Sequence, residues 1–203
     1  MNILAVDCCL KLTGAALMAD GVIDAEQYDL GRRQSSELPH MAERLMRKHN
    51  LSWDSLDCIA ITNGPGYFTG IRVGAAYASG LAYASGAKII PVSSLELLAQ
   101  SSGLSGKVLV LVYAGHGFVY ASCSGSLEAG EYSHAQILSW LGDNPDAVII
   151  SDDPDRTGLH DLDIKMVKPD MISLCETARK NIHLAVSPME LKILYYRAPQ
   201  GMN

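Results

Sequence analysis

The chain has 203 residues, of which 48% are apolar and 19% charged, and its formal net charge is −6. This length and apolar content suffice to bury a core, so a folded protein is expected rather than a disordered chain. The acidic balance and the lack of a Lys/Arg cluster exclude a surface that by itself grips a polyanion. Five cysteines without CxxC or metal-type spacing indicate reduced thiols and a cytoplasmic protein. We expect neither export nor membrane insertion, because the sequence shows no basic leader and no long apolar stretch.

The first half of the chain predicts a three-stranded meander followed by alternating helices and strands. Residues 2–6 form an apolar run closed by Asp7, which suits a buried strand whose last side chain reaches a cleft. Asp20 and Gly21 are a hairpin signal between the next two strands. The expected elements are strands at 2–6, 13–18, 22–28, 58–62 and 88–92, a helix capped by Ser35 or Ser36 that ends near Asn50, a helix at about 69–84, and a short helix after a capping box of Ser93 and Glu96.

The second half of the chain repeats this order. Small, flexible residues at 101–106 (SSGLSG) indicate a connection, so we expect an N-terminal domain at 1–104 and a smaller, divergent C-terminal domain at 105–203. The elements expected there are strands at 107–113 and 118–123 and a helix that is capped by Ser133 with Gln136 and ends before Gly142. Such an echo suggests duplication. It predicts an α/β protein with the duplicated ribonuclease H-like (ASKHA) fold of the actin, hexokinase and Hsp70 group; an unrelated α/β fold with coincidental hairpins is the alternative.

The segment 58–87 is unusual because Arg72 is its only charged residue. A helix that is apolar nearly all round is normally covered on more than one side. Each of its three central glycines costs the helix about 1 kcal/mol relative to alanine, which close backbone packing would recover. A helical wheel separates two faces, one with Gly70, Gly74, Tyr77, Ala78 and Leu81 and the other with Arg72, Ala76, Ser79 and Tyr83. The first face can meet the sheet and the second is typical of an interface; the alternative is a helix buried inside the monomer.

Four segments of the chain resemble one protein family. GPGYFTGIRVG at 64–74, PVSSL at 91–95 and ILAVD at 3–7 are similar to segments of the TsaB (YeaZ) family, whose first run reads much like GPGSFTGVRIG. ELKILYYR at 190–197 resembles the family's closing segment, which ends in YLR. The resemblance covers residues 1 to about 100 well and the rest weakly. The chain has Gln34-Ser35-Ser36 where the family usually has a histidine, and its second-half strand lacks the acid and basic pair of the family's DARRGEVY-like run.

The resemblance implies a non-catalytic scaffold and activator in the threonylcarbamoyladenosine (t6A) modification of adenosine 37 in tRNAs that read ANN codons. The implied partners are a TsaD-type enzyme, met through two N-terminal helices as a heterodimer, and a TsaE-type protein. A homodimer is expected when the partner is absent, and tRNA is met only indirectly. No cofactor is expected on this chain alone, although ATP or ADP fits the interface with the partner.

The residues expected at the partner interface belong to the two N-terminal helices: Gly70, Arg72, Val73, Gly74, Ala76, Tyr77, Ser79, Tyr83, Leu38, Met41 and Leu45. The residues expected in a vestigial nucleotide cleft are Asp7, Gly64, Pro65, Gly66, Phe68 and Thr69. No catalytic and no metal-binding residues are expected.

Two other classes of function stay open, a small ASKHA-type ATP-dependent enzyme (a kinase or an M22 glycoprotease-like protein) and a regulatory homodimer. A kinase-like cleft needs acids from both halves to hold Mg²⁺, and the second half places Tyr113 where a matching acid would fall. His40 and His49 are too far apart to share one helix face, which argues against a metal pair. The run Asp152, Asp153 and Asp155 favours a solvated turn over a cation site.

Overall fold

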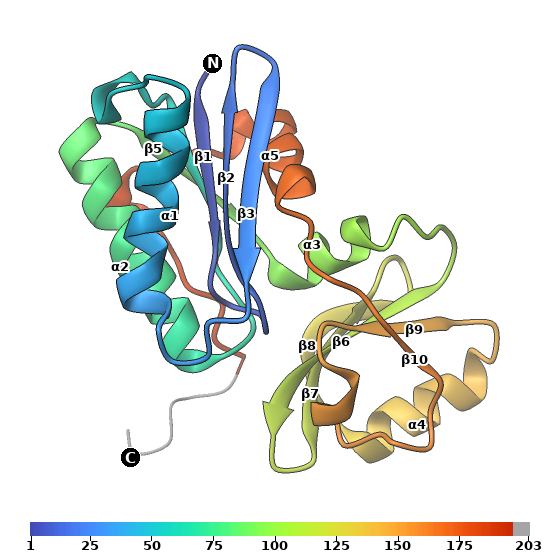
Figure 1. Cartoon of the computed structure of the whole chain (residues 1–203). Coiled ribbons are helices and arrows are strands. Elements are labelled where there is room, and N and C mark those ends of the chain that lie inside the picture. Colours follow the sequence, from blue (N-terminus) through green and yellow to red (C-terminus); the bar gives the residue numbers. More distant parts are fainter. Residues whose placement is uncertain (197–203) are drawn as a thin grey trace.

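The computed structural model describes residues 1–196 and consists of two lobes, each built on a five-stranded mixed sheet (Figure 1). The first sheet has the strand order β3-β2-β1-β4-β5. Its first three strands form an antiparallel meander, and β4 and β5 continue from β1 in parallel. The strand bounds are β1 Ile3–Asp7, β2 Thr13–Ala19, β3 Val22–Tyr28, β4 Cys58–Thr62 and β5 Lys88–Val92.

The second sheet repeats the first, because its order β8-β7-β6-β9-β10 places the meander and the two parallel strands in the same positions. The strand bounds are β6 Val108–Gly115, β7 Phe118–Cys123, β8 Leu127–Ser133, β9 Val148–Ser151 and β10 Ile164–Met166. Two sheets with this shared order and these directions confirm the duplicated ribonuclease H-like fold.

Helices cover both faces of the first sheet. Helices α1 and α2 pack on one face and α5 on the other (Figure 1). The helix bounds are α1 Gln34–Lys48, α2 Phe68–Ser85, α3 Ser94–Ser101, α4 His134–Asp143 and α5 Met171–Lys180, and four short 3-10 turns are η1 Trp53–Ser55, η2 Pro154–Arg156, η3 Ile182–Leu184 and η4 Pro188–Glu190. No helix among residues 1–196 is both long and apolar enough to cross a membrane.

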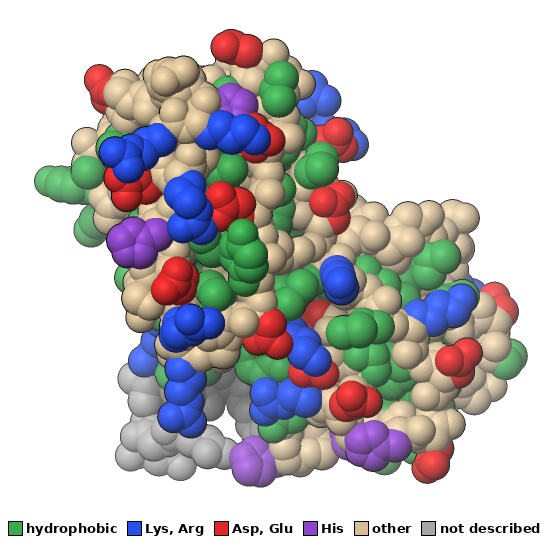
Figure 2. All heavy atoms as spheres, viewed as in Figure 1, with side chains coloured by type: hydrophobic (Ala, Val, Ile, Leu, Met, Phe, Trp, Pro, Cys, Tyr) green, Lys and Arg blue, Asp and Glu red, His purple; other side chains and the backbone are tan. Residues whose placement is uncertain are grey.

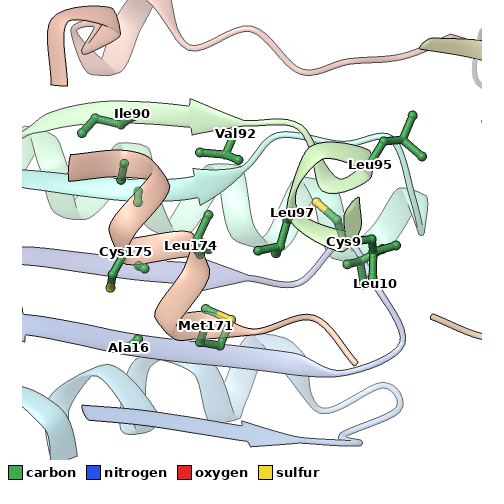
Figure 3. Close-up of a cluster of buried hydrophobic side chains, with 14 of the residues drawn as sticks. Cys9, Leu10, Ala16, Ile90, Val92, Leu95, Leu97, Met171, Leu174 and Cys175 are labelled. Atoms are coloured by element: carbon green, nitrogen blue, oxygen red, sulfur yellow. The ribbon is translucent and has the colours of Figure 1, made fainter. Parts of the chain in front are cut away.

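The lobes are tied together because helix α5 follows the strands of the second sheet but packs on the first. Met171, Leu174 and Cys175 of α5 lie over the strands that carry Ala16 and Val92 (Figure 3). Helix α3 in turn packs against β6 of the second sheet. The boundary between residues 104 and 105 stays a prediction. The packing of α5 shows that the chain returns to the first lobe after β10.

Helix ends differ from the sequence-based expectations at three places, and one of them is the end of α4, which runs to Asp143 and not only to a residue before Gly142. Helix α1 begins at Gln34 after Arg33, so Ser35 and Ser36 lie inside its first turn and do not cap it. Ser93 precedes α3 but its side chain makes no cap hydrogen bond, so the expected capping box with Glu96 is wrong. The other expected box, at the start of α4, is confirmed.

Candidate functional site

An exposed stripe runs along the outer side of α2. The side chains of Phe68, Arg72, Ala76 and Tyr83 are exposed, and Tyr83 reaches an exposed fraction of 81%. These residues recur at helical spacing, so they lie along one side of the helix. Their neighbours Val73, Tyr77 and Ser79 are half-buried at the border of the stripe. Arg72 is the only ionised side chain on α2, so the exposed surface of this helix is nearly free of charge.

The glycines expected at the interface are instead on the inner side of α2. A Cβ atom added to Gly70 would overlap the backbone carbonyl oxygen of Cys8, so a glycine is required where α2 crosses the end of β1. A Cβ atom on Gly74 would lie 3.6 Å from Cys8 and Ile61 atoms, an ordinary contact distance. Both glycines are buried on the inner side of the helix, which corrects their assignment to a partner surface.

The three α1 residues expected at the interface are also misplaced. Leu38 and Met41 have no exposed surface and Leu45 has 2%, because the apolar side of α1 packs on β2 and α2. Buried side chains of the monomer's own core cannot contact a partner on the surface. The exposed side of α1 carries charged side chains at Glu43, Arg44, Arg47 and Lys48.

The end of the described chain forms a strap, residues 186–196, along α2. Val186 exchanges backbone hydrogen bonds with Ile89 at the edge of the first sheet, and η4 packs against α2. The Tyr195 ring lies 5.7 Å from the Phe68 ring, and Tyr196 lies 6.1 Å from Tyr120 of the second lobe. Of the closing segment 190–197 noted in the sequence, Arg197 lies outside the described residues.

A second candidate region lies between the lobes, where each half of the chain contributes a buried carboxylate. Asp7 at the end of β1 is fully buried and accepts hydrogen bonds from the Thr62 hydroxyl and the Cys9 backbone N–H. Asp152 follows β9 and accepts the Lys11 backbone N–H at 2.8 Å. Burial is the main reason that the pKa of each acid is raised to about 6, and the charge of Asp152 adds to the effect on Asp7.

Asp153 extends this contact between the lobes. It pairs with the Lys11 ammonium at 3.0 Å and accepts a long hydrogen bond from Tyr67 at 3.4 Å. Arg156 lies over the rings of Tyr113 and Tyr67, at 4.2 and 5.1 Å. The cavity beside this cluster has a volume of about 810 Å³ and includes Lys11, Arg32, Tyr67, Phe68, Asp153 and Arg156 in its lining.

The expected solvated turn at 152–155 is therefore wrong for its first two acids. Asp152 and Asp153 keep only 4% and 6% of their surface exposed, whereas Asp155 is exposed. The second half thus does supply an acid to the cavity, Asp153, which follows β9, whereas the sequence predicts Tyr113 of β6 at the matching position. The sequence carried a usable signal, because the apolar residues 148–150 followed by acids repeat the pattern of β1 and Asp7.

The residues expected in the vestigial cleft are only partly brought together. Phe68 and Thr69 line the cavity of about 810 Å³, but Asp7, Gly64, Pro65 and Gly66 do not. Gly64 and Pro65 are buried under α3, where the backbone N–H and the hydroxyl of Ser94 donate to their carbonyl oxygens. Within residues 1–196 no three His, Cys, Asp or Glu side chains are grouped to hold a metal ion.

The fold and the site define a class: a duplicated ribonuclease H-like protein whose cleft acids are held by donors of its own chain and whose second helix exposes a nearly uncharged stripe. A sequence model of the family described as "TsaD: tRNA N6-adenosine threonylcarbamoyltransferase" matches residues 29–150. The chain belongs to this family, and within it to the TsaB (YeaZ) type, a relative of TsaD.

Individual relatives agree with this placement. The "tRNA threonylcarbamoyladenosine biosynthesis protein TsaB" of Escherichia coli K12 is 29% identical over 152 residues, which are 73% of this chain and 62% of that protein. The protein of the same name from Buchnera aphidicola is 27% identical over 72% of this chain and 68% of its own length. The solved structure "YeaZ from Pseudomonas aeruginosa" has a TM-score of 0.72 at 21% identity and covers 96% of this chain and 99% of its own. That likeness shows the shared fold.

Proposed function

We propose that this chain is a non-catalytic partner of a TsaD-type enzyme in the t6A modification of adenosine 37 in tRNAs that read ANN codons. Family membership supports the link to this modification. The observation that carries the partner role is the exposed stripe on α2, with its two large aromatic residues, small residues between them and one arginine. Protein interfaces are enriched in aromatic residues and arginine and depleted of other charges.

The charge distribution supports an indirect role toward tRNA. Acidic and basic side chains are interspersed over the face drawn in Figure 2, without a broad basic area. Because phosphate binding needs concentrated positive charge, tRNA is contacted through the partner. A protein that serves tRNA modification in this way works in the cytoplasm, and a TsaE-type protein is a further member of the assembly.

The cleft acids support a non-catalytic role, because donors of this chain hold one oxygen atom each of Asp7 and Asp152 and both oxygen atoms of Asp153, while the second oxygen atom of Asp7 is buried without a partner among residues 1–196. Lys11 engages Asp152 and Asp153, and Thr62 with Cys9 engages Asp7. Acids held in this way are poorly placed to coordinate a nucleotide-bound cation without breaking the contact between the lobes. Any ATP or ADP therefore binds at the interface with the partner and not to this chain alone.

The test is binding to the TsaD homologue of the same organism, measured by isothermal titration calorimetry with the wild-type chain and Ala76→Arg. Ala76 lies in the middle of the stripe, and an arginine there would hold α2 and the facing surface of the partner apart. We expect binding to weaken about tenfold or more, which corresponds to about 1.4 kcal/mol.

The matched control is Ala129→Arg, at an exposed alanine of β8 in the second lobe. It adds the same side chain and should leave the affinity unchanged. Both variants should melt close to the wild-type temperature, because surface substitutions usually change stability by only about 0.5 kcal/mol. If the wild-type chain does not bind the homologue, or if Ala76→Arg binds as well as Ala129→Arg, the proposed surface is wrong.

A further inference from the structure

Arg72 is held in place by two aromatic residues, one from the first turn of its own helix and one from the end of the described chain. Its guanidinium carbon lies 3.8 Å from the centre of the Phe68 ring, one turn earlier on α2. Its Nε donates to the Tyr195 hydroxyl at 3.4 Å, and the Tyr195 ring packs against Phe68 at 5.7 Å. The strap thus closes over the first turn of α2 and limits the conformations of the arginine.

The charge of Arg72 has no counterpart in the described chain. Arg72 forms no ion pair with any of residues 1–196, although it is exposed and the protein is acidic overall. Stacking on Phe68 and the bond at Nε leave the two terminal nitrogens Nη1 and Nη2 without a hydrogen-bond acceptor among these residues. Two parallel N–H groups on a planar guanidinium match the two oxygens of a carboxylate.

We propose that Phe68, Arg72 and Tyr195 form a carboxylate-binding anchor within the partner surface, in which Arg72 receives an aspartate or glutamate side chain of the partner. Tyr195 is the positioning residue. The proposal rests on the proposed function and adds to it what the partner presents: an acidic side chain flanked by apolar groups. Phe68 and Tyr195 are 41% and 39% exposed, so they surround the arginine with an apolar collar that a partner would cover.

The test compares variants of Arg72 and Tyr195 in the titration with the TsaD homologue, at low and at high NaCl concentration. Arg72→Met keeps a long side chain but removes the charge, and we expect about tenfold weaker binding and a smaller loss of affinity with salt. Arg72→Lys keeps the charge but cannot form the paired hydrogen bonds, so its affinity should lie between those of wild type and Arg72→Met.

Tyr195→Phe tests the positioning role, because it removes only the hydroxyl group that holds Nε. We expect about threefold weaker binding with the salt dependence preserved, since the charge is still present. In a chain that already carries Arg72→Met, Tyr195→Phe should have no further effect. Tyr196→Phe is the control, because the neighbouring Tyr196 ring contacts Tyr120 in the second lobe and not Arg72.

The outcomes separate the anchor from the proposed function. If Ala76→Arg abolishes binding while Arg72→Met keeps both the affinity and its salt dependence, the anchor is wrong and the partner surface stands. If Tyr195→Phe weakens binding equally in the wild-type chain and in the Arg72→Met variant, the tyrosine does not act through Arg72 and its positioning role is wrong. If the wild-type chain fails to bind, both proposals fail together.

Discussion

At the scale of single residues, the two acids between the lobes are costly to keep ionised. Asp7 and Asp152 are buried and their pKa values are raised from 3.8 to about 6, chiefly because burial disfavours the charged form. In the unfolded chain these acids ionise near pH 4, and in the folded chain only near pH 6. The stability that the protonated acids provide is therefore complete below about pH 4 and is lost as the pH rises through about 6.

We expect the free energy of unfolding to fall between pH 4.5 and 7.5, with each acid contributing up to about 3 kcal/mol, since a shift of about two pKa units corresponds to that energy. Asp7→Asn and Asp152→Asn should each flatten the dependence on pH, because an amide does not ionise. Urea denaturation at several pH values measures this. Asp161→Asn, at an exposed position, is the control and should follow the wild-type curve. A wild-type curve that rises with pH over this range would contradict the prediction.

At the scale of elements, helix α2 shows what sequence patterns can and cannot predict. The wheel separated the inner face with Gly70 from the outer face with Arg72, because a period of 3.6 residues is written directly in the sequence. It could not tell which glycine makes the close backbone contact. That depends on where α2 crosses β1, and the contact is the one between Gly70 and the Cys8 carbonyl group.

This contact predicts opposite effects for two substitutions in the same helix. Gly70→Ala should destabilise the protein by about 1 to 3 kcal/mol, because the new methyl group overlaps the Cys8 carbonyl oxygen. Gly80→Ala should stabilise it by up to about 1 kcal/mol, since no atom beyond the helix's own neighbouring backbone lies within 4 Å of the added carbon and alanine favours the helix. Thermal denaturation of both variants gives the sign of each effect. Equal effects of the two changes would show that helix propensity, and not the contact with Cys8, decides at position 70.

The helix caps and α1 also show that a local sequence motif does not determine the contacts that its residues make in the folded chain. Ser133 and Gln136 cap α4 as a local sequence motif should, whereas Ser93 has the motif without the bond. In α1 the apolar spacing of Leu38 and Met41 predicted the helix but not its environment. An apolar stripe shows that a helix buries one face, and it does not distinguish the chain's own sheet from a partner.

At the scale of the whole molecule, the duplication was visible in the sequence as a repeated order of strands and turns. The sequence did not show that α3 packs against the second sheet or that α5 packs on the first. Helix α5, which lies near the C-terminal end of the chain, covers the second face of the first sheet. The strap 186–196 comes later in the sequence and lies along α2. These are long-range contacts that no local pattern encodes. For the same reason, the meeting of Asp7 with Asp152 could be found only once both sheets were in place, because the two acids come from different halves of the sequence.

The arrangement also predicts how the free protein behaves. The stripe on α2 and the aromatic residues of the strap lie on one continuous part of the first lobe, and Tyr83 and Met189 are 81% and 89% exposed. Apolar groups gathered in this way are costly to leave in water, so we expect the chain to form a homodimer through the stripe when its partner is absent.

Gel filtration with light scattering at high micromolar concentration should show the dimer for wild type and a monomer for Ala76→Arg. Because both assemblies use the stripe, adding an equimolar TsaD homologue should replace the homodimer by the heterodimer. A wild-type chain that stays monomeric at this concentration would show that the stripe is tolerated in water, and a homodimer that persists in Ala76→Arg would place the self-contact elsewhere on the protein.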